Sequence, residues 1–239
     1  MRILHLYYDF MNLYGEYANV SALERLFTKS GIDCTVDKMS FSDTPKLKDY
    51  DIIYMGSGTE RNLRVVLEDM RKYRDDLKEY IADGKVLLMT GNSFELTGKT
   101  LTAADGSSVE GLGLYDFTVT EQNKTRTTSD AIFTADFSEK PLVGFINKCS
   151  SISGIKAPLF SVKMGLGNDE GGFEGIRDRN FFGTHLTGPV LIKNPHFLCY
   201  IAGIAAGEGA VLSEEHLGYE KAGYEITLTE LTAVMNKTN

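Results

Sequence analysis

Apolar and polar residues follow a regular order along the N-terminal part of the chain. Short apolar runs predict β-strands at Arg2–Tyr8, Cys34–Met39, Asp51–Met55 and Val86–Met89. Between them, apolar residues at helical spacing predict helices over Asn19–Ser30 and Arg61–Asp83, the second with a break near Asp75. This alternation of strands and helices predicts an α/β fold, a three-layer sandwich around an open, mostly parallel sheet with right-handed crossovers.

The stretch Val86–Gly98, VLLMTGNSFELTG, is the part of this pattern that points to a functional site. Val86–Met89 is continuously apolar, as in a central strand that is covered on both faces. The next residues form a turn, and Asn92 or Ser93 is the predicted N-cap of a short helix. Backbone N–H groups at such a corner face the space in front of it, which is where α/β enzymes hold a nucleophile.

The pattern changes after Gly98, where short β-rich segments are interrupted by Gly, Ser and Asn. These segments predict antiparallel strands and loops on the sheet edge, at Leu114–Thr120, Ala131–Phe137, Pro141–Ile146 and Leu159–Lys163, followed by a strand and loop at Phe181–Ile192. Pro195–Ala206 is a predicted helix with proline in its first turn. The residues after Gly209 are polar, and composition leaves open whether they form a terminal helix or are partly loose.

Composition narrows the possible functions. The 239 residues carry a formal net charge of −8 without a basic stretch, which argues against nucleic acid or an anionic membrane as a partner. No apolar run approaches the ~18 residues of a membrane-spanning helix. Three widely separated cysteines fit reduced thiols, so we expect a cytoplasmic protein. The histidines and cysteines show no metal-binding spacing, and neither a metal nor a cofactor is predicted.

Several motifs in a fixed order resemble one enzyme family. The chain contains HLYYDFMNLYGEYAN, DYDIIYMGSGTE, GLGLYDF, GFEGIRDRNFFGT and GPVLIKNP. These phrases resemble class I glutamine amidotransferases of the cobyric acid synthase type, and most closely the amidotransferase subunits of lipid II isoglutaminyl synthases. The resemblance implies a flavodoxin-like α/β fold with an amidotransferase-like domain over residues 1–208. Residues 209–239 are then a C-terminal extension of the same domain.

Both catalytic positions of this family are replaced. The family typically reads C-G-G-Y-Q-L-L-G at the nucleophile corner, and the chain has Gly91 in place of the cysteine that attacks the glutamine amide. The family's G-T-Y-L-H-G-P carries the general base in its histidine, and the chain has Thr187 there. His185 lies two residues earlier and is a possible substitute, although a packed histidine in place of the family's tyrosine is the simpler interpretation. Cys149 is the one cysteine in a predicted loop.

Other elements of the family's pocket are retained. Gly56, Ser57 and Gly58 follow the third strand, where related enzymes contribute a backbone N–H to the oxyanion hole, and the Asn92 N–H has the complementary place. Glycines also suit any turn between a strand and a helix, so this feature alone leaves both interpretations open. Arg126 aligns with the arginine that holds the carboxylate of the substrate glutamine, although a solvated loop arginine is also consistent with its surroundings.

Two functions are therefore expected. The preferred one is a catalytically degenerate amidotransferase-like subunit that binds a Mur-ligase-like synthetase, or glutamine or a related small carboxylate. The alternative is an active glutamine amidotransferase that supplies ammonia to a ligase in cell-wall precursor amidation. The loss of both the nucleophile at Gly91 and the base at Thr187 favours the first.

Overall fold

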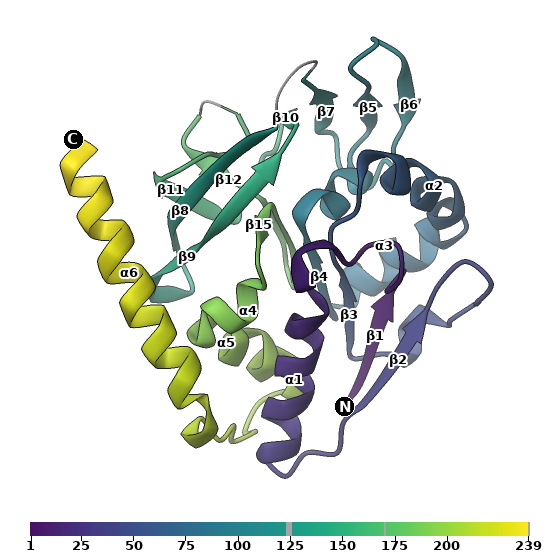
Figure 1. Cartoon of the computed structure of the whole chain (residues 1–239). Helices are drawn as coiled ribbons and strands as arrows, with labels where there is room; N and C mark the ends of the chain where they lie inside the picture. The colour runs from purple at the N-terminus through teal and green to yellow at the C-terminus, as the bar shows by residue number, and fades with distance from the viewer. Residues whose placement is uncertain (123–125, 170, 239) are drawn as a thin grey trace.

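A six-stranded sheet forms the centre of the protein in the computed structural model, which describes residues 1–122, 126–169 and 171–238 (Figure 1). Its strand order is β13-β14-β4-β3-β1-β2, and all neighbours are parallel except the β13–β14 pair. The strands are β1 (Arg2–Leu6), β2 (Thr35–Met39), β3 (Ile52–Met55), β4 (Val86–Thr90), β13 (Ile176–Asp178) and β14 (Phe181–Thr184). The mostly parallel central sheet expected from the sequence is thus confirmed.

Helices cover both faces of this sheet and complete the three layers. One face packs against α1 (Tyr17–Lys29), α4 (Val190–Lys193) and α5 (Pro195–Ala206), and the other against α2 (Glu60–Met70) and α3 (Arg74–Ala82) (Figure 1). Strand β4 shows why its whole length is apolar. Val86 and Leu88 face the α1 side, Leu87 and Met89 face the α2 side, and all four are buried.

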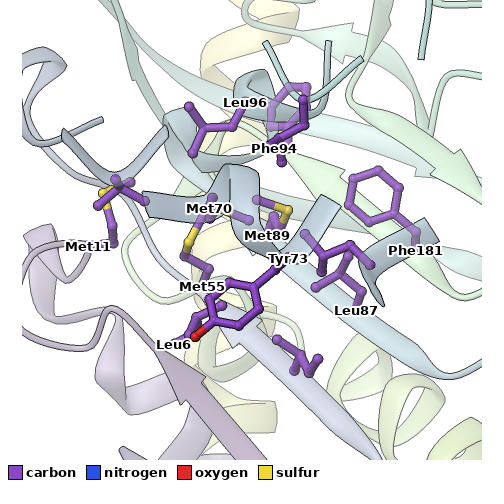
Figure 2. Close-up of a cluster of buried hydrophobic side chains, with 14 of the residues drawn as sticks. Leu6, Met11, Met55, Met70, Tyr73, Leu87, Met89, Phe94, Leu96 and Phe181 are labelled. Atoms are coloured by element: carbon purple, nitrogen blue, oxygen red, sulfur yellow. The ribbon is translucent and has the colours of Figure 1, made fainter. Parts of the chain in front are cut away.

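A methionine-rich cluster lies beneath the corner that follows β4 (Figure 2). Met55 and Met89 come from the central strands and Met70 from the end of α2, while Phe94 and Leu96 descend from the corner itself. Each is at most 1% exposed. Methionine fills irregular gaps because its unbranched side chain adapts to its neighbours. The corner therefore packs against a buried apolar cluster.

The predicted helix over 61–83 is two helices. A 3₁₀ turn at Arg71–Tyr73 separates α2 from α3, slightly before the break expected near Asp75. The predicted start of the first helix is also slightly late, because α1 begins at Tyr17 rather than at Asn19. The second half of the chain forms two further sheets rather than a few strands on the sheet edge.

One further sheet is antiparallel and has the strand order β12-β11-β8-β9-β15. Its strands are β8 (Thr127–Ala135), β9 (Ser138–Lys148), β11 (Phe160–Met164), β12 (Phe173–Glu174) and β15 (Leu186–Thr187). The other has the order β10-β7-β5-β6, in which β5 and β7 are parallel. Its strands are β5 (Thr100–Thr102), β6 (Ser108–Glu110), β7 (Thr118–Glu121) and β10 (Ser150–Ser153).

The C-terminal residues form one long helix, α6 (Gly218–Thr238), which lies along the side of the molecule against α4, α5, β8 and β9 (Figure 1). The question left open by composition is thereby answered in favour of a helix. Within the described residues, no helix is long and apolar enough to cross a membrane. The helix is anchored at Tyr224, which is 2% exposed and donates a hydrogen bond to the Pro141 carbonyl oxygen at 2.8 Å.

We expect Tyr224→Ala to lower the free energy of unfolding by about 3 kcal/mol or more, because it removes a buried aromatic ring and its hydrogen bond. Ile226→Ala on the same helix is the matched control. Ile226 is 65% exposed, so its loss should change stability by no more than about 0.5 kcal/mol. Urea unfolding of the three proteins measures both values. Equal stability of the two variants would show that α6 is not anchored at Tyr224.

Candidate functional site

The corner after β4 is a tight 3₁₀ segment, Gly91–Thr97, and not the capped helix that the sequence predicted. Gly91 has a φ of +63°, in the left-handed region that favours glycine. Neither Asn92 nor Ser93 is its N-cap. The Asn92 side chain instead accepts a hydrogen bond from the Gly58 N–H at 3.0 Å and donates one to the Gly58 carbonyl oxygen at 2.9 Å. The corner is thereby tied to the loop after β3.

Ser57 occupies the space into which a side chain at position 91 would project. A Cβ atom built on Gly91 would lie 2.2 Å from the Cβ of Ser57 and 3.0 Å from its hydroxyl oxygen. Real Cβ atoms do not approach one another that closely, so residues 57 and 91 cannot both carry a side chain without a backbone shift. Ser57 is 3% exposed. Ser57 therefore fills the space in front of Gly91, the position that the resemblance aligns with the family's nucleophile.

Two backbone donors of the loop after β3 are already used within the protein. The Ser57 N–H donates to Glu16 Oε2 at 2.7 Å, and the Ser57 hydroxyl donates to the same oxygen at 2.8 Å. The Gly58 N–H is bound by Asn92. The prediction that this loop contributes a backbone N–H to an oxyanion hole is therefore not supported at Ser57 or Gly58, because each N–H has an internal acceptor.

Glu16 is the residue that makes this arrangement possible. It is fully buried, and burial raises its pKa to about 7 against the opposing effect of the hydrogen bonds from Ser57 and Thr90. Its Oε1 atom has no hydrogen-bond partner among the described residues. Glu16 was not a candidate in the sequence because its partner Ser57 lies on a different loop, far along the chain.

His185 is held between two buried carboxylates. Its Nε2 atom lies 2.9 Å from Glu95 Oε1, and its Nδ1 atom lies 3.2 Å from Glu174 Oε1. A histidine ring that donates hydrogen bonds from both nitrogens is an imidazolium, and two carboxylate acceptors favour that form. Burial lowers the pKa of His185, but the hydrogen bonds to Glu174 and Glu95 outweigh it, and the net pKa is raised.

Lys148 completes a four-charge cluster with these three residues. It is 9% exposed and donates hydrogen bonds to the carbonyl oxygens of Gly167 and Asn168. Burial lowers the pKa of Lys148, and the nearby Glu174 and Glu95 carboxylates oppose this shift without reversing it. The cluster thus places two basic side chains beside two acidic ones, the pairing that burial of such groups requires.

Thr187, at the base position of the family, takes no part in this cluster. Its hydroxyl donates to the Phe145 carbonyl oxygen at 3.0 Å, across the pairing of β15 with β9. In the described part of the chain, no hydrogen bond or ion pair joins Thr187 or His185 to Gly91 or Ser57. The substitute role considered for His185 is not supported, because both of its ring nitrogens are already bound.

Arg126 lines a small cavity together with Asn92 of the corner, and its guanidinium is already paired. Nη1 and Nη2 donate to Glu60 Oε1 at 2.7 and 2.8 Å, and Nε donates to Asn147 Oδ1 at 2.9 Å. The cavity that remains between Arg126, Asn92 and their neighbours measures about 10 Å³. That is room for about one water molecule.

Cys149 lines the same cavity but lacks the character of a nucleophile. Its thiol donates to Glu60 Oε1 at 3.1 Å, and burial together with this hydrogen bond raises its pKa to about 12. A thiol with that pKa is almost entirely protonated near pH 7, whereas attack requires the thiolate.

The structure therefore unites only part of the site predicted from sequence. Asn92, Ser57 and Gly58 meet at the Gly91 corner, and Arg126 and Cys149 share the small cavity beside it. The carboxylates that bind these groups were missed, namely Glu16, Glu60, Glu95 and Glu174. The sequence did carry one signal for this contact. By the resemblance, Glu95 stands where the family has glutamine and His185 where it has tyrosine. An acidic and a basic residue that replace two neutral ones favour an ion pair between them.

We expect the stability that His185 confers to decline as pH rises. Its folded-state pKa lies above the ~6.5 of an unfolded histidine, so this stabilisation is complete below about pH 6.5 and is lost as pH rises through the folded pKa. Denaturant unfolding of wild type and His185→Gln should therefore show a larger difference at pH 6 than at pH 9.

His196→Gln is the control for this comparison, because burial lowers the pKa of His196 to about 4. A lowered pKa gives no decline in stability between pH 6 and pH 9. If the His185 difference were the same at both pH values, the imidazolium assignment would be wrong.

Comparison with known proteins identifies the family. A family model described as a CobB/CobQ-like glutamine amidotransferase domain matches residues 2–195. A curated relative from Staphylococcus aureus, the GatD subunit of lipid II isoglutaminyl synthase (glutamine-hydrolyzing), is 32% identical over 202 residues, which cover 84% of this chain and 82% of the relative. The Streptococcus pneumoniae protein of the same name is 32% identical over 198 residues, covering 81% and 76%.

Solved structures agree on the fold. The structure of PurLQS from Thermotoga maritima matches with a TM-score of 0.59 at 13% identity, over 85% of this chain and 94% of the other. A glutamine amidotransferase crystal structure matches with a TM-score of 0.55 at 12% identity, over 85% and 99%. At such low identity the likeness concerns the fold alone, and it confirms the class I amidotransferase-like architecture. With the family model matching most of its length, this chain belongs to the CobB/CobQ-like glutamine amidotransferase family.

Proposed function

We propose that this chain is a non-hydrolysing amidotransferase-like subunit that acts through a ligase partner in cell-wall precursor amidation. The observation that carries the proposal is the contact at the corner, where the Cβ of Ser57 lies 2.2 Å from the position of a Cβ on Gly91. A nucleophile at position 91 has no room beside Ser57. The second support is that both nitrogens of His185 are bound by carboxylates, so this ring is not free to move protons during a reaction.

The partner and the pathway are proposed from the relatives. Both curated relatives are named as subunits of a lipid II isoglutaminyl synthase, and a subunit implies a second protein. The family resemblance implies a Mur-ligase-like synthetase in that role. The three cysteines are free, which agrees with a reducing cytoplasm, where lipid II precursors would be amidated.

We also propose that a small carboxylate binds at Arg126, which requires it to replace the partner that this guanidinium already has. Glutamine, glutamate or another small carboxylate would have to compete with Glu60 for the guanidinium, and little empty space remains beside it. The alternative function, an active glutaminase, would need Cys149 or another group as the nucleophile. The raised pKa of Cys149 and the hydrogen bonds that hold His185 both argue against an active glutaminase.

We expect purified wild-type protein to release no ammonia from glutamine above background, with or without a co-purified ligase. In a serine protease that lacked its whole triad, the remaining rate lay ~10⁶-fold below that of the intact enzyme. Ammonia release measured with a coupled assay tests this directly. Wild-type turnover near ~1 s⁻¹, the lower end of ordinary enzyme rates, would overturn the proposal.

Restoring the two family residues should not suffice. Gly91→Cys with Thr187→His should remain inactive, because Ser57 still occupies the nucleophile's space. Adding Ser57→Gly to that pair should give measurable ammonia release, since nucleophile and base act as a unit and now have room. Activity in the double variant equal to that of the triple variant would show that Ser57 does not block the site.

The same contact predicts a stability change. Gly91→Cys alone should destabilise the fold by roughly 1–3 kcal/mol, because a Cβ is added both at a positive φ and against Ser57. Ser57→Gly should recover part of that loss when combined with Gly91→Cys. A double-mutant cycle measured by denaturant unfolding gives the coupling between the two positions. Additive effects would mean that the two side chains do not compete for one space.

A further inference from the structure

Glu60 meets Arg126 in the way that a bound carboxylate would. The carboxylate lies at the first residue of α2, whose N-cap Thr59 accepts a hydrogen bond from the Asn62 N–H. One oxygen, Oε1, accepts hydrogen bonds from Nη1 and Nη2 of Arg126 and from the Cys149 thiol. Three donors therefore converge on a single atom of Glu60.

The contact between Arg126 and Glu60 uses only one of the two carboxylate oxygens. A guanidinium binds a carboxylate best through two parallel hydrogen bonds, one to each oxygen. Glu60 Oε2 makes no hydrogen bond to the described residues, and both guanidinium NH₂ groups share Oε1. A free carboxylate can present both oxygens to the guanidinium and is the better partner in geometry.

Arg126 is held in place without help from Glu60. Its Nε atom donates to Asn147 Oδ1 at 2.9 Å, and the Asn147 amide in turn donates to the Tyr14 hydroxyl at 3.0 Å. The guanidinium therefore keeps its orientation when its carboxylate partner changes. Preorganisation of this kind reduces the entropy lost on ligand binding.

The pair is also open to exchange. The side chains of Arg126 and Glu60 are 38% and 34% exposed, so solvent reaches both. Ion pairs at this exposure contribute little to stability because water and salt screen them. Glu60 can leave without unfolding the protein, and its departure widens a cavity that now measures about 10 Å³.

We infer that Glu60 is an internal ligand that closes a carboxylate-binding site centred on Arg126, and that a small carboxylate such as an α-amino acid binds by displacing it. This inference rests on the proposed function and specifies how the ligand site of that subunit is controlled. Occupancy by Glu60 keeps the site closed at low ligand concentration. Displacement would free the first residue of α2, next to the Gly91 corner.

The experiment measures binding of L-glutamate by titration calorimetry to wild type and to Glu60→Ala. The variant removes the competing carboxylate and leaves its volume empty, so we expect affinity to rise at least tenfold. Glu60→Gln, which removes the charge but keeps the size, should show a smaller gain. Adding Arg126→Gln to Glu60→Ala should abolish the gain. Glu68→Ala, an exposed carboxylate on the same helix paired with Arg71, should behave as wild type.

Inorganic phosphate at matched ionic strength tests the ligand class. Phosphate binding to Glu60→Ala as tightly as glutamate would show a general anion site and overturn the carboxylate assignment. Unchanged glutamate affinity in both Glu60 variants would overturn the inference as a whole. Neither result bears on ammonia release by the wild type, so failure of this inference and failure of the proposed function are distinguishable.

The thiol of Cys149 gives a second readout. The hydrogen bond to Glu60 helps to raise the pKa of Cys149, so Glu60→Ala should make this thiol react faster with a maleimide. Glutamate should slow the reaction again by restoring a carboxylate at the same place, with Glu60→Ala/Cys149→Ser identifying the signal. A reaction rate that glutamate leaves unchanged would contradict binding at Arg126.

Discussion

The central constraint of this protein is that the ends of β3 and β4 leave room for one side chain between them. A Cβ on Gly91 and the Cβ of Ser57 would be separated by only 2.2 Å. In this backbone a cysteine at position 91 would need a glycine at position 57 or a backbone shift, and the chain has the opposite arrangement, with glycine at 91 and serine at 57. Because Ser57 fills the space, its hydroxyl and N–H need a buried acceptor, which Glu16 provides. Asn92 then binds Gly58 and closes the loop against the corner.

The His185 cluster shows how a histidine can lie near such a site and still be unable to serve as a base. Glu95 belongs to the corner, Glu174 to β12 and Lys148 to the end of β9, so the cluster joins the central sheet to a second one. Removing one partner from a buried ion pair typically costs ~3–5 kcal/mol, because the other charge is left uncompensated. A ring under that constraint is held for structure. A catalytic base, in contrast, must gain and release a proton at each turnover.

The fold could be predicted from the sequence wherever apolar periodicity was strong. The predicted bounds of strands β1 to β4 and helix α5 lie close to the observed ones, because short apolar runs bounded by turn residues favour strands and longer runs at helical spacing favour helices. Strands such as β5 and β10, with the sequences TLT and SSIS, escaped prediction because serine and threonine alternate without a clear apolar face. In the site, the loss of cysteine and histidine was visible. The close approach of Ser57 to Gly91 was not visible, since it depends on how closely two loops approach in the folded chain.

The way in which the pocket is closed has a chemical consequence. An apolar filling would have left the polar groups of an amidotransferase site buried and unpaired, at a cost of ~1–3 kcal/mol for each. This chain instead gives several of these groups an internal partner: Glu16 for the Ser57 N–H, Asn92 for the Gly58 N–H, Glu60 for Arg126, and Glu95 with Glu174 for His185. Polar partners preserve the geometry of the groups that they bind. A site closed in this manner can therefore be reopened by replacing single side chains, whereas an apolar core would have to be repacked.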